Sequence, residues 1–176
     1  MTEDRPPLPD VGPVVSSAHL ADSALPPLSE VEFAVTMMNN AYHRWMVRCM
    51  TAAGGPAMSP LEVLILHLVH HRGREKTLAE VCLILNIEDT HLASYAIRKL
   101  TQARLVEPGR KGKEKTIRIT EEGARLCARY KEVREALLVR AARQLGRDPQ
   151  DISRLAALLR ALSGSYDQAA RAAAAL

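Results

Sequence analysis

Residues 77–120 read TLAEVCLILNIEDTHLASYAIRKLTQARLVEPGRKGKEKTIRIT, and this stretch decides the fold. A capping box, T-x-x-E, opens a first helix over residues 77–85. A tight turn follows, and Asp89 or Glu88 then caps a second helix that runs to about Ala103. The pattern predicts two helices joined by a short turn.

A basic hairpin follows the two helices. We expect two short antiparallel strands over Leu105–Glu107 and Thr116–Ile119, separated by the segment PGRKGKEK with two glycines for the turn. Glu114 opposes four cations in that segment, so its net charge is +3. The four cations are Arg110, Lys111, Lys113 and Lys115. Helix, turn, helix, strand, basic tip and strand in this order predict a winged helix-turn-helix.

The second helix has one apolar and one polar face. Its predicted buried stripe, spaced i, i+3, i+4 and i+7, consists of Ala93, Ala96, Ile97 and Leu100. A helix fits the major groove of DNA, where Arg98 can reach a guanine or a phosphate. The basic tip can follow the backbone or enter the minor groove. The alternative is a surface helix beside a solvated loop with no binding role, but the order of the elements favours DNA binding. The expected DNA-binding residues are Thr90, His91, Ser94, Tyr95, Arg98, Lys99, Arg110, Lys111, Lys113 and Lys115.

Long amphipathic helices are expected on both sides of this module. A helix with a capping box of Ser29 and Glu32 runs to about Ala53, and its apolar residues follow a heptad pattern. A second capping box, of Ser59 and Glu62, opens a nearly all-apolar helix. The heptad positions of the first helix are Val31, Val35, Met38, Tyr42, Trp45 and Cys49.

Two more helices are expected after the hairpin. Thr120 caps one that runs to about Leu145, and Asp148 caps the last. The apolar stripe of the last helix is Ile152, Leu155, Leu159, Leu162, Tyr166 and Ala169. Stripes of this length predict a helical dimerisation layer. The expected divisions are a disordered tail over 1–28, a dimerisation helix and linker over 29–58, the DNA-binding module over 59–120 and C-terminal dimerisation helices over 121–176.

Composition agrees with a mainly α protein that carries a small β-wing. Aromatic residues make up only 3% of the 176 residues, so the core must be aliphatic, which favours helices. Six of the ten prolines lie in residues 1–28, and the formal net charge is +4. The N-terminus lacks a signal-peptide pattern and no apolar run reaches 18 residues, so we expect a cytoplasmic protein without a membrane span. An odd number of cysteines, three, agrees with a reducing compartment.

The chain resembles the MarR family of winged-helix transcription regulators over about Ser29 to Ala170. The resemblance rests on the order of elements, on LAEVCLILNI before the second helix, on RKLTQARLV at its end, and on IRITEEG after the wing. It implies a homodimer formed by the terminal helices, a pseudo-palindromic double-stranded operator, and release of DNA when a small ligand binds between the dimer and DNA layers.

Two departures from the family pattern limit what is carried over. The wing, GRKGKEK, is shorter than usual and has lysines in place of an Asp-Arg-Arg motif. Tyr95 stands where many relatives have arginine. The resemblance therefore implies where the second helix lies on DNA, but not which bases it prefers.

Control by a small-molecule effector is the favoured mode of regulation. The residues that we expect to line its pocket, between the first two long helices, are Tyr42, Met46, Leu66 and His70. We find no glycine-rich phosphate loop and no nucleophile motif, so we expect neither an enzyme nor a cofactor. A helical adaptor that uses the winged module for protein contacts remains an alternative.

Zinc and thiol sensing are further alternatives. His67, His70 and His71 have metal-compatible helical spacing, and Cys49 or His43 would add a ligand, although core packing is the simpler role and we assign no metal site. Reactive thiols need exposure and nearby positive charge. Cationic residues do flank two of the cysteines, but all three also lie near apolar stripes; they are Cys49, Cys82 and Cys127.

Overall fold

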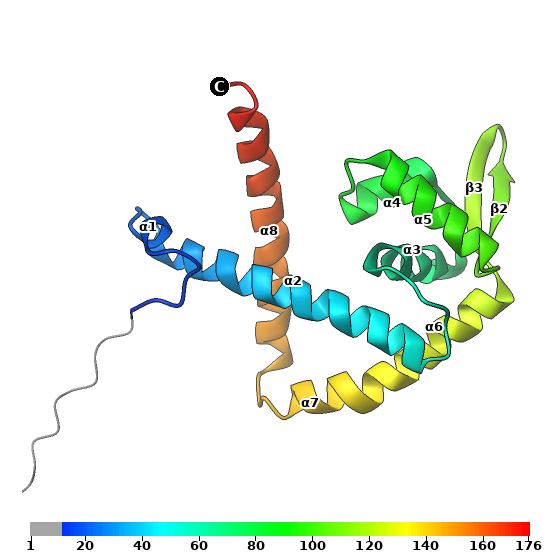
Figure 1. Ribbon diagram of the computed structural model, residues 1–176, viewed down its shortest axis with the longest axis horizontal. Coiled ribbons are helices and arrows are strands. Elements are labelled where there is room, and N and C mark those ends of the chain that lie inside the picture. Colours follow the sequence, from blue (N-terminus) through cyan, green and yellow to red (C-terminus); the bar gives the residue numbers. More distant parts are fainter. Residues whose placement is uncertain (1–11) are drawn as a thin grey trace, which may run out of the picture. The chain divides into compact units, whose positions relative to one another are not determined.

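The computed structural model describes residues 12–176, which divide into two compact units between Tyr130 and Lys131. The first unit contains α1 (Ala18–Ala21), α2 (Pro26–Ala52), α3 (Pro60–His70), the 3₁₀ turn η1 (His71–Gly73), β1 (Lys76–Thr77), α4 (Leu78–Leu85), α5 (Thr90–Gln102), β2 (Val106–Lys111), β3 (Glu114–Ile119) and most of α6 (Glu121–Arg134). The second contains the end of α6, the π-helical segment η2 (Glu135–Val139), α7 (Arg140–Arg143) and α8 (Pro149–Ala173). The fold is mainly helical with a small three-stranded wing, as expected (Figure 1).

Side-chain caps place the helices of the first unit where the sequence predicts them. The capping boxes of Ser59 with Glu62 and of Thr77 with Glu80 are both complete. Asp89, one of the two expected candidates, caps α5 by accepting a hydrogen bond from the His91 amide at 2.8 Å. Each cap satisfies an amide that the first turn of a helix leaves without an intrahelical acceptor.

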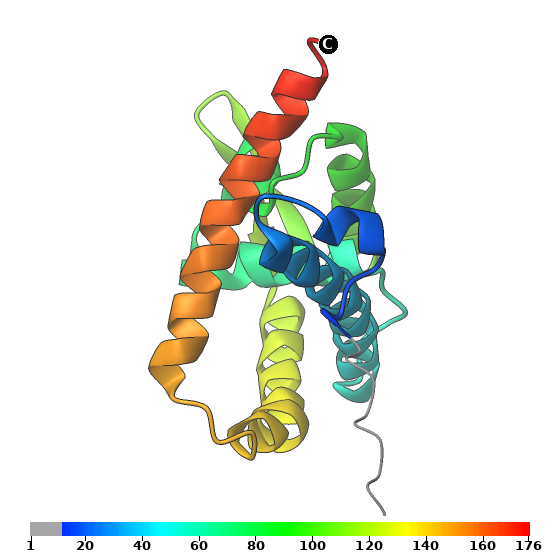
Figure 2. The same cartoon turned by 90° about the vertical axis from the view of Figure 1, so that its left-hand side faces the viewer.

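The start of α2 differs from the prediction. The helix begins at Pro26 rather than Ser29, because proline, with its fixed φ and missing amide donor, suits the first turn of a helix. Ser29 is consequently not a cap. It lies buried inside the helix, and its hydroxyl donates to the Leu20 carbonyl at 2.5 Å, which ties α2 to α1 (Figure 2). Of the tail expected over residues 1–28, residues 1–11 lie outside the described chain.

The wing is longer and tighter than predicted. Its three antiparallel strands have the order β1-β3-β2, and β1 was not expected. Lys111 pairs with Glu114, so the connection is a two-residue turn in which Gly112 has φ 62°. A two-residue hairpin loop needs positive φ, which glycine adopts without steric cost. Arg110, Lys111 and Lys115 therefore lie on paired strands and not on a loose tip.

The core of the first unit is aliphatic, as the composition predicts. The expected stripe of α5 is confirmed, with Ala93, Ala96 and Leu100 buried and Ile97 partly so. Small side chains at two of these positions let α5 pack closely on α3. The largest fully buried side chains include Met46, Met50, Ile65, Leu66, Leu100 and Leu126.

The regular elements of the second unit are all helical. A continuous helix was expected from Thr120 to about Leu145, but η2 interrupts it, and no glycine or proline in that segment explains the change. Asp148 caps α8 as predicted by accepting from the Gln150 amide at 2.8 Å. Among residues 12–176, no helix combines the length and apolar character that crossing a membrane requires.

Candidate nucleic-acid interface

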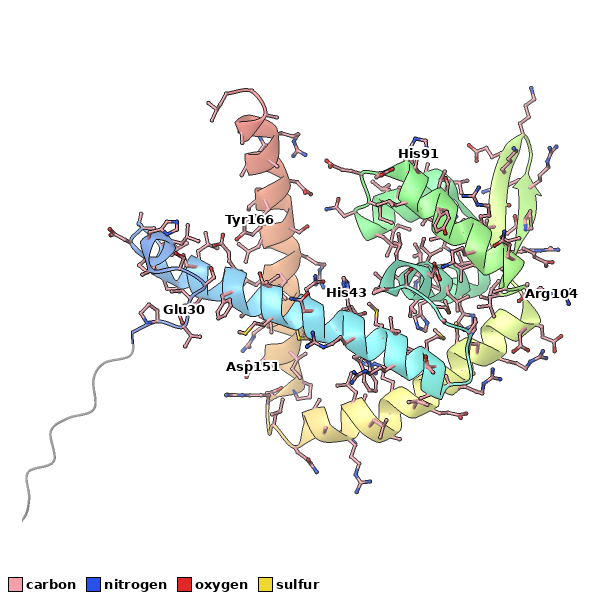
Figure 3. All side chains as sticks on the ribbon, viewed as in Figure 1. Glu30, His43, His91, Arg104, Asp151 and Tyr166 are labelled. Carbon is pink, nitrogen blue, oxygen red and sulfur yellow. The ribbon has the colours of Figure 1, made fainter. Side chains whose placement is uncertain are left out.

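Helix α5 presents its polar face to solvent. Its apolar stripe packs on α3 and α4, which leaves the opposite side free (Figure 1). Thr90, His91, Ser94 and Arg98 are exposed, and Figure 3 shows His91 on the outer side of the helix. The expected contact residues on this face are thus together and accessible.

Tyr95 and Arg98 form a pair on this face. The Tyr95 side chain is 53% exposed, and the Arg98 guanidinium carbon lies 5.3 Å from the centre of its ring. The negative face of an aromatic ring attracts a guanidinium at this distance. Stacking restricts the rotamers of Arg98 in the free protein. The side chain therefore loses less conformational entropy when it is ordered against a base.

Lys99 has a different environment from the other expected contacts. Its ammonium lies 2.9 Å from a carboxylate oxygen of Glu62, whose side chain is only 5% exposed. The hydrogen bond and the negative charge of Glu62 together raise the pKa of Lys99 above its ordinary value. The Lys99 ammonium is also 5.8 Å from the Tyr95 ring. Its expected role as a DNA contact stays a prediction, and the structure adds an intramolecular partner.

The β2–β3 hairpin stands beside α5 in the first unit (Figure 1). Arg110 and Lys115 face each other across the ladder, and Lys113 occupies the turn. All four wing cations are exposed, and within residues 12–176 none of them has a carboxylate at ion-pair distance. At the base of the hairpin, Arg118 does pair with Glu107 at 2.8 Å. The positive charge of the tip is therefore free for an external anion.

A packed polar junction holds the base of the wing. The Thr116 hydroxyl donates to the Glu75 carboxylate at 2.6 Å, and both lie so close to Gly109 that a side chain there would collide with them. The buried Lys76 ammonium donates to the Arg74 carbonyl at 2.5 Å and to the His71 carbonyl at 3.2 Å. Burial is the main cause that lowers the pKa of Lys76. These contacts fix the wing against the turn that follows α3.

The structure also identifies residues that the sequence interpretation left out. Leu92 is 57% exposed on the first turn of α5, beside the expected contacts. Glu62 was assigned only to a capping box, although it also holds Lys99. The exposed Leu92 was visible in the helical pattern, because it falls outside the buried stripe. The long-range partner of Glu62 had no sequence signal.

The residues expected to line an effector pocket fall into two environments. Met46 and Leu66 are fully buried, whereas Tyr42 and His70 are exposed. Two cavities of the first unit are lined by other residues: one of about 470 Å³ lies beside the wing, and one of about 300 Å³ lies along the start of α2. The pocket therefore stays a prediction.

His67, on α3, is a partly buried titratable group. Its ring meets that of Tyr130 edge-on, with ring centres 4.5 Å apart, and within the described chain its Nε2 atom has no hydrogen-bond partner. Burial, with a smaller contribution from His70, lowers the pKa of His67. Core packing is the role that these contacts support.

The zinc and thiol alternatives gain no support from the geometry. In the part of the chain that the structure describes, no three His, Cys, Asp or Glu side chains are placed to hold a metal ion. All three cysteines are buried. Burial raises the pKa of the Cys127 thiol to about 11, which suppresses the reactive thiolate.

Comparison with known proteins agrees with this geometry. Residues 58–123 match the family model of a winged helix DNA-binding domain. No curated protein matches the sequence. Among solved structures, a MarR-family regulator from Neisseria meningitidis has a TM-score of 0.63 at 15% identity, covering 81% of this chain and 94% of its own. A MarR-family regulator from a Rhodococcus species has a TM-score of 0.61 at 16% identity, and the match covers 76% of this chain and 91% of the regulator.

A third similar structure is CouR from Rhodococcus jostii, which was solved with p-coumaroyl-CoA bound. Its TM-score is 0.61 at 16% identity, covering 83% of this chain and 95% of its own. At such identities the likeness concerns the fold alone. Residues 58–123 are thus a winged helix DNA-binding domain, within a chain that has the fold of the MarR-family transcription regulators.

Proposed function

We propose that the protein is a homodimeric transcription regulator that binds a two-fold, double-stranded DNA operator. The observation that carries this proposal is the exposed polar face of α5 next to the tip of a hairpin. Within residues 12–176, the four cations of that tip have no carboxylate at ion-pair distance. A helix and an adjacent cationic hairpin supply the two kinds of contact that DNA recognition needs, base edges and phosphates.

The base contacts are assigned to the first half of α5. Ser94 and Tyr95 have hydroxyl groups that can donate to base acceptors, and Arg98 can pair with guanine O6 and N7. Thr90 and His91 begin the helix and lie where the backbone of the groove wall is within reach. These assignments predict that substitutions on α5 change sequence preference.

The wing is assigned to phosphates. Arg110, Lys111, Lys113 and Lys115 are long cationic side chains on exposed positions of a rigid hairpin. Each phosphate that is neutralised releases condensed counterions, so affinity falls with salt by a slope of roughly −0.9 per contact. Between 50 and 200 mM salt, the four contacts of one chain would lower affinity by roughly a factor of 150, and the eight contacts of a dimer by roughly a factor of 2 × 10⁴.

Dimerisation is assigned to the long helices outside the DNA-binding domain. In α8 the expected stripe is exposed, including Ile152, Leu155 and Tyr166. The first half of the α2 stripe is also exposed, at Val35 and Met38. Apolar stripes that run along entire helices are typical of surfaces that a partner covers. A second copy of the chain supplies a matching stripe by symmetry.

Modulation by a small molecule is part of the proposal. CouR, which shares this fold, was solved with p-coumaroyl-CoA bound. We assign the effector of the present protein to the region around Met46 and Leu66, with Tyr42 and His70 at its rim. Substituting the two rim residues is expected to change the response of DNA binding to an effector with little effect on folding, because both side chains are exposed.

Selection of genomic fragments by the purified protein, followed by mobility shift at increasing salt, tests the proposal. We expect recovery of one or a few two-fold sequences, bound by two chains, with an affinity that falls steeply with salt. Absence of a shift on any fragment at low salt would favour the adaptor alternative, for which the exposed Leu83 and Ile84 of α4 would be the first candidate contacts.

A further inference from the structure

Glu62 links two helices through one carboxylate. One oxygen accepts a hydrogen bond from the Ser59 amide at 3.2 Å and completes the capping box of α3. The other oxygen lies 2.9 Å from the Lys99 ammonium on α5. Because the Glu62 side chain is almost completely buried, its charge acts in a less polar environment than a surface carboxylate does. The capping box in turn fixes the position of that charge.

The pair continues into the polar face of α5. The Lys99 ammonium is 5.8 Å from the centre of the Tyr95 ring, and the Arg98 guanidinium is 5.3 Å from it. Glu62 thus restrains Lys99, and the ring of Tyr95 lies within range of both cations. Without Glu62, the flexible Lys99 side chain would be free to leave the ring and to reach for other anions.

We propose that Glu62 is a positioning residue for sequence reading: it keeps the Lys99 ammonium away from DNA phosphates and thereby holds Tyr95 and Arg98 in place. This inference rests on the proposed function. Specificity is the difference between the affinities for the correct and the incorrect sequence. A free lysine beside the reading face would strengthen binding to every sequence equally, because phosphates carry no sequence information. Neutralising Lys99 internally therefore lowers non-specific binding and preserves discrimination.

The salt dependence of DNA binding should report on the position of Lys99. Releasing Lys99 onto a phosphate adds one contact per chain, so the slope of log affinity against log salt becomes steeper by about 0.9 for each chain, or about 1.8 for the dimer. If the added contacts leave the affinity at 1 M salt unchanged, one contact strengthens non-specific binding at 0.1 M salt by roughly eightfold, and the two contacts of the dimer strengthen it by roughly sixtyfold. Affinity for the specific site gains less, because Tyr95 and Arg98 lose their fixed arrangement.

Three variants of the full chain separate the possibilities. Glu62→Gln keeps an acceptor for the capping box, since glutamine also serves at this position, but removes the charge. Lys99→Met keeps an unbranched side chain of similar length without the ammonium. The double variant removes both charges. Each is titrated by fluorescence anisotropy on the selected duplex and on a scrambled duplex at several salt concentrations, and urea unfolding reports whether it is folded.

We expect Glu62→Gln to steepen the slope on both duplexes by about 0.9 for each chain, or about 1.8 for the dimer, and to lower the ratio of specific to non-specific affinity. Lys99→Met is expected to keep the wild-type slope and to lose about two- to fivefold in specific affinity as the contact with Tyr95 is lost. The double variant should return to the wild-type slope, because the steepening requires the lysine.

Two results would overturn the inference. A slope that becomes shallower in Lys99→Met by about 0.9 for each chain, or about 1.8 for the dimer, would make Lys99 a phosphate contact in the wild-type protein. An unchanged slope and an unchanged affinity ratio in a folded Glu62→Gln variant would show that the pair has no part in reading. If Glu62→Gln does not fold, the Lys99→Met slope alone decides. A wild-type chain that binds no DNA at all would refute the proposed function as well, so the two failures are distinguishable.

Discussion

Replacing Gly123 by alanine should destabilise the protein, although the same substitution in a helix usually stabilises it. Gly123 lies in the first turn of α6, where its amide donates to the Thr120 hydroxyl at 3.0 Å. A Cβ atom there would lie 2.1 Å from the Leu105 carbonyl oxygen and 2.8 Å from the Cδ1 atom of Ile119. The Leu105 carbonyl also accepts from the amide and hydroxyl of Thr120, at 3.2 and 3.0 Å. The collision is therefore with backbone that is held in place.

The magnitude follows from the overlap. Ordinary contact begins near 3.4 Å, so the backbone of Leu105 must move by about 1.3 Å. Overpacking of this kind costs about 1–3 kcal/mol, more where backbone must shift, and the better helix propensity of alanine returns roughly 1 kcal/mol. We expect a net loss of about 2 kcal/mol in the free energy of unfolding. Because β2 begins at Val106, the same shift should displace the wing and weaken DNA binding.

Gly164→Ala is the matched control. Gly164 lies in the interior of α8, and a Cβ there would meet nothing within 4 Å. This variant should gain roughly 0.5–1 kcal/mol from helix propensity alone. Urea unfolding followed by circular dichroism, at one fixed protein concentration, measures both variants. Equal or increased stability of Gly123→Ala would refute the close packing of α6 on the Leu105 carbonyl.

Four further predictions follow from single side chains. Lys113→Ala should make the salt slope shallower by about 0.9 for each chain, or about 1.8 for the dimer, and weaken binding about equally on specific and scrambled duplexes. A loss confined to one sequence would contradict a phosphate contact. Arg98→Ala should cost on the order of 1–3 kcal/mol on the specific duplex in anisotropy titrations, and an unchanged specific affinity would remove its assigned role. Because the folded protein lowers the pKa of His67, the stability that depends on the neutral ring is complete above the unfolded pKa near 6.5 and is lost as pH falls through the folded pKa. The urea midpoint of wild type should therefore fall between pH 7.5 and 5, and it should fall less in His67→Gln. The exposed control His71→Gln should behave like wild type. With a pKa of about 11, Cys127 should react with a thiol reagent at pH 7.5 far more slowly in the native protein than in urea, and fast native labelling at this residue would revive thiol sensing.

Local signals in the sequence predicted most element boundaries of the DNA-binding domain. In the capping boxes at Ser59 and Thr77, the two residues that exchange hydrogen bonds are three positions apart. A short sequence pattern is therefore enough to predict where each helix begins. The buried stripe of α5 was equally visible, because helical periodicity alone places Ala93, Ala96 and Leu100 on one side.

Where two local rules compete, the sequence misled. At the start of α2, S-x-x-E matched a cap, but Pro26 and Pro27 were also compatible with a first helical turn, and the contact of Ser29 with Leu20 favours the earlier start. Strand β1 is two residues long and exists through its pairing with β3. No local sequence pattern predicts a strand of that length, because its hydrogen-bond partners lie some forty positions away in the chain.

The sequence predicts which residues of the candidate site are exposed, but not which of them contact one another. Exposure of Arg98 and of the wing lysines follows from charge and periodicity. The pairing of Lys99 with Glu62 depends on how α3 packs on α5, and that geometry joins residues from separate capping and helical patterns. Sequence reasoning therefore placed Lys99 among the DNA contacts, while the structure gives it an internal partner as well.

Hydroxyl-radical footprinting of a selected genomic fragment, combined with the mass of the complex in solution, tests whether the protein binds a two-fold operator as a homodimer. We predict two chains per site and two protected patches related by two-fold symmetry, with centres about one helical turn apart. Lys113→Ala should weaken protection at the flanks of each patch before the centre. A single asymmetric patch bound by one chain, or no protection at low salt, would show that the protein is not a homodimeric reader of two-fold DNA.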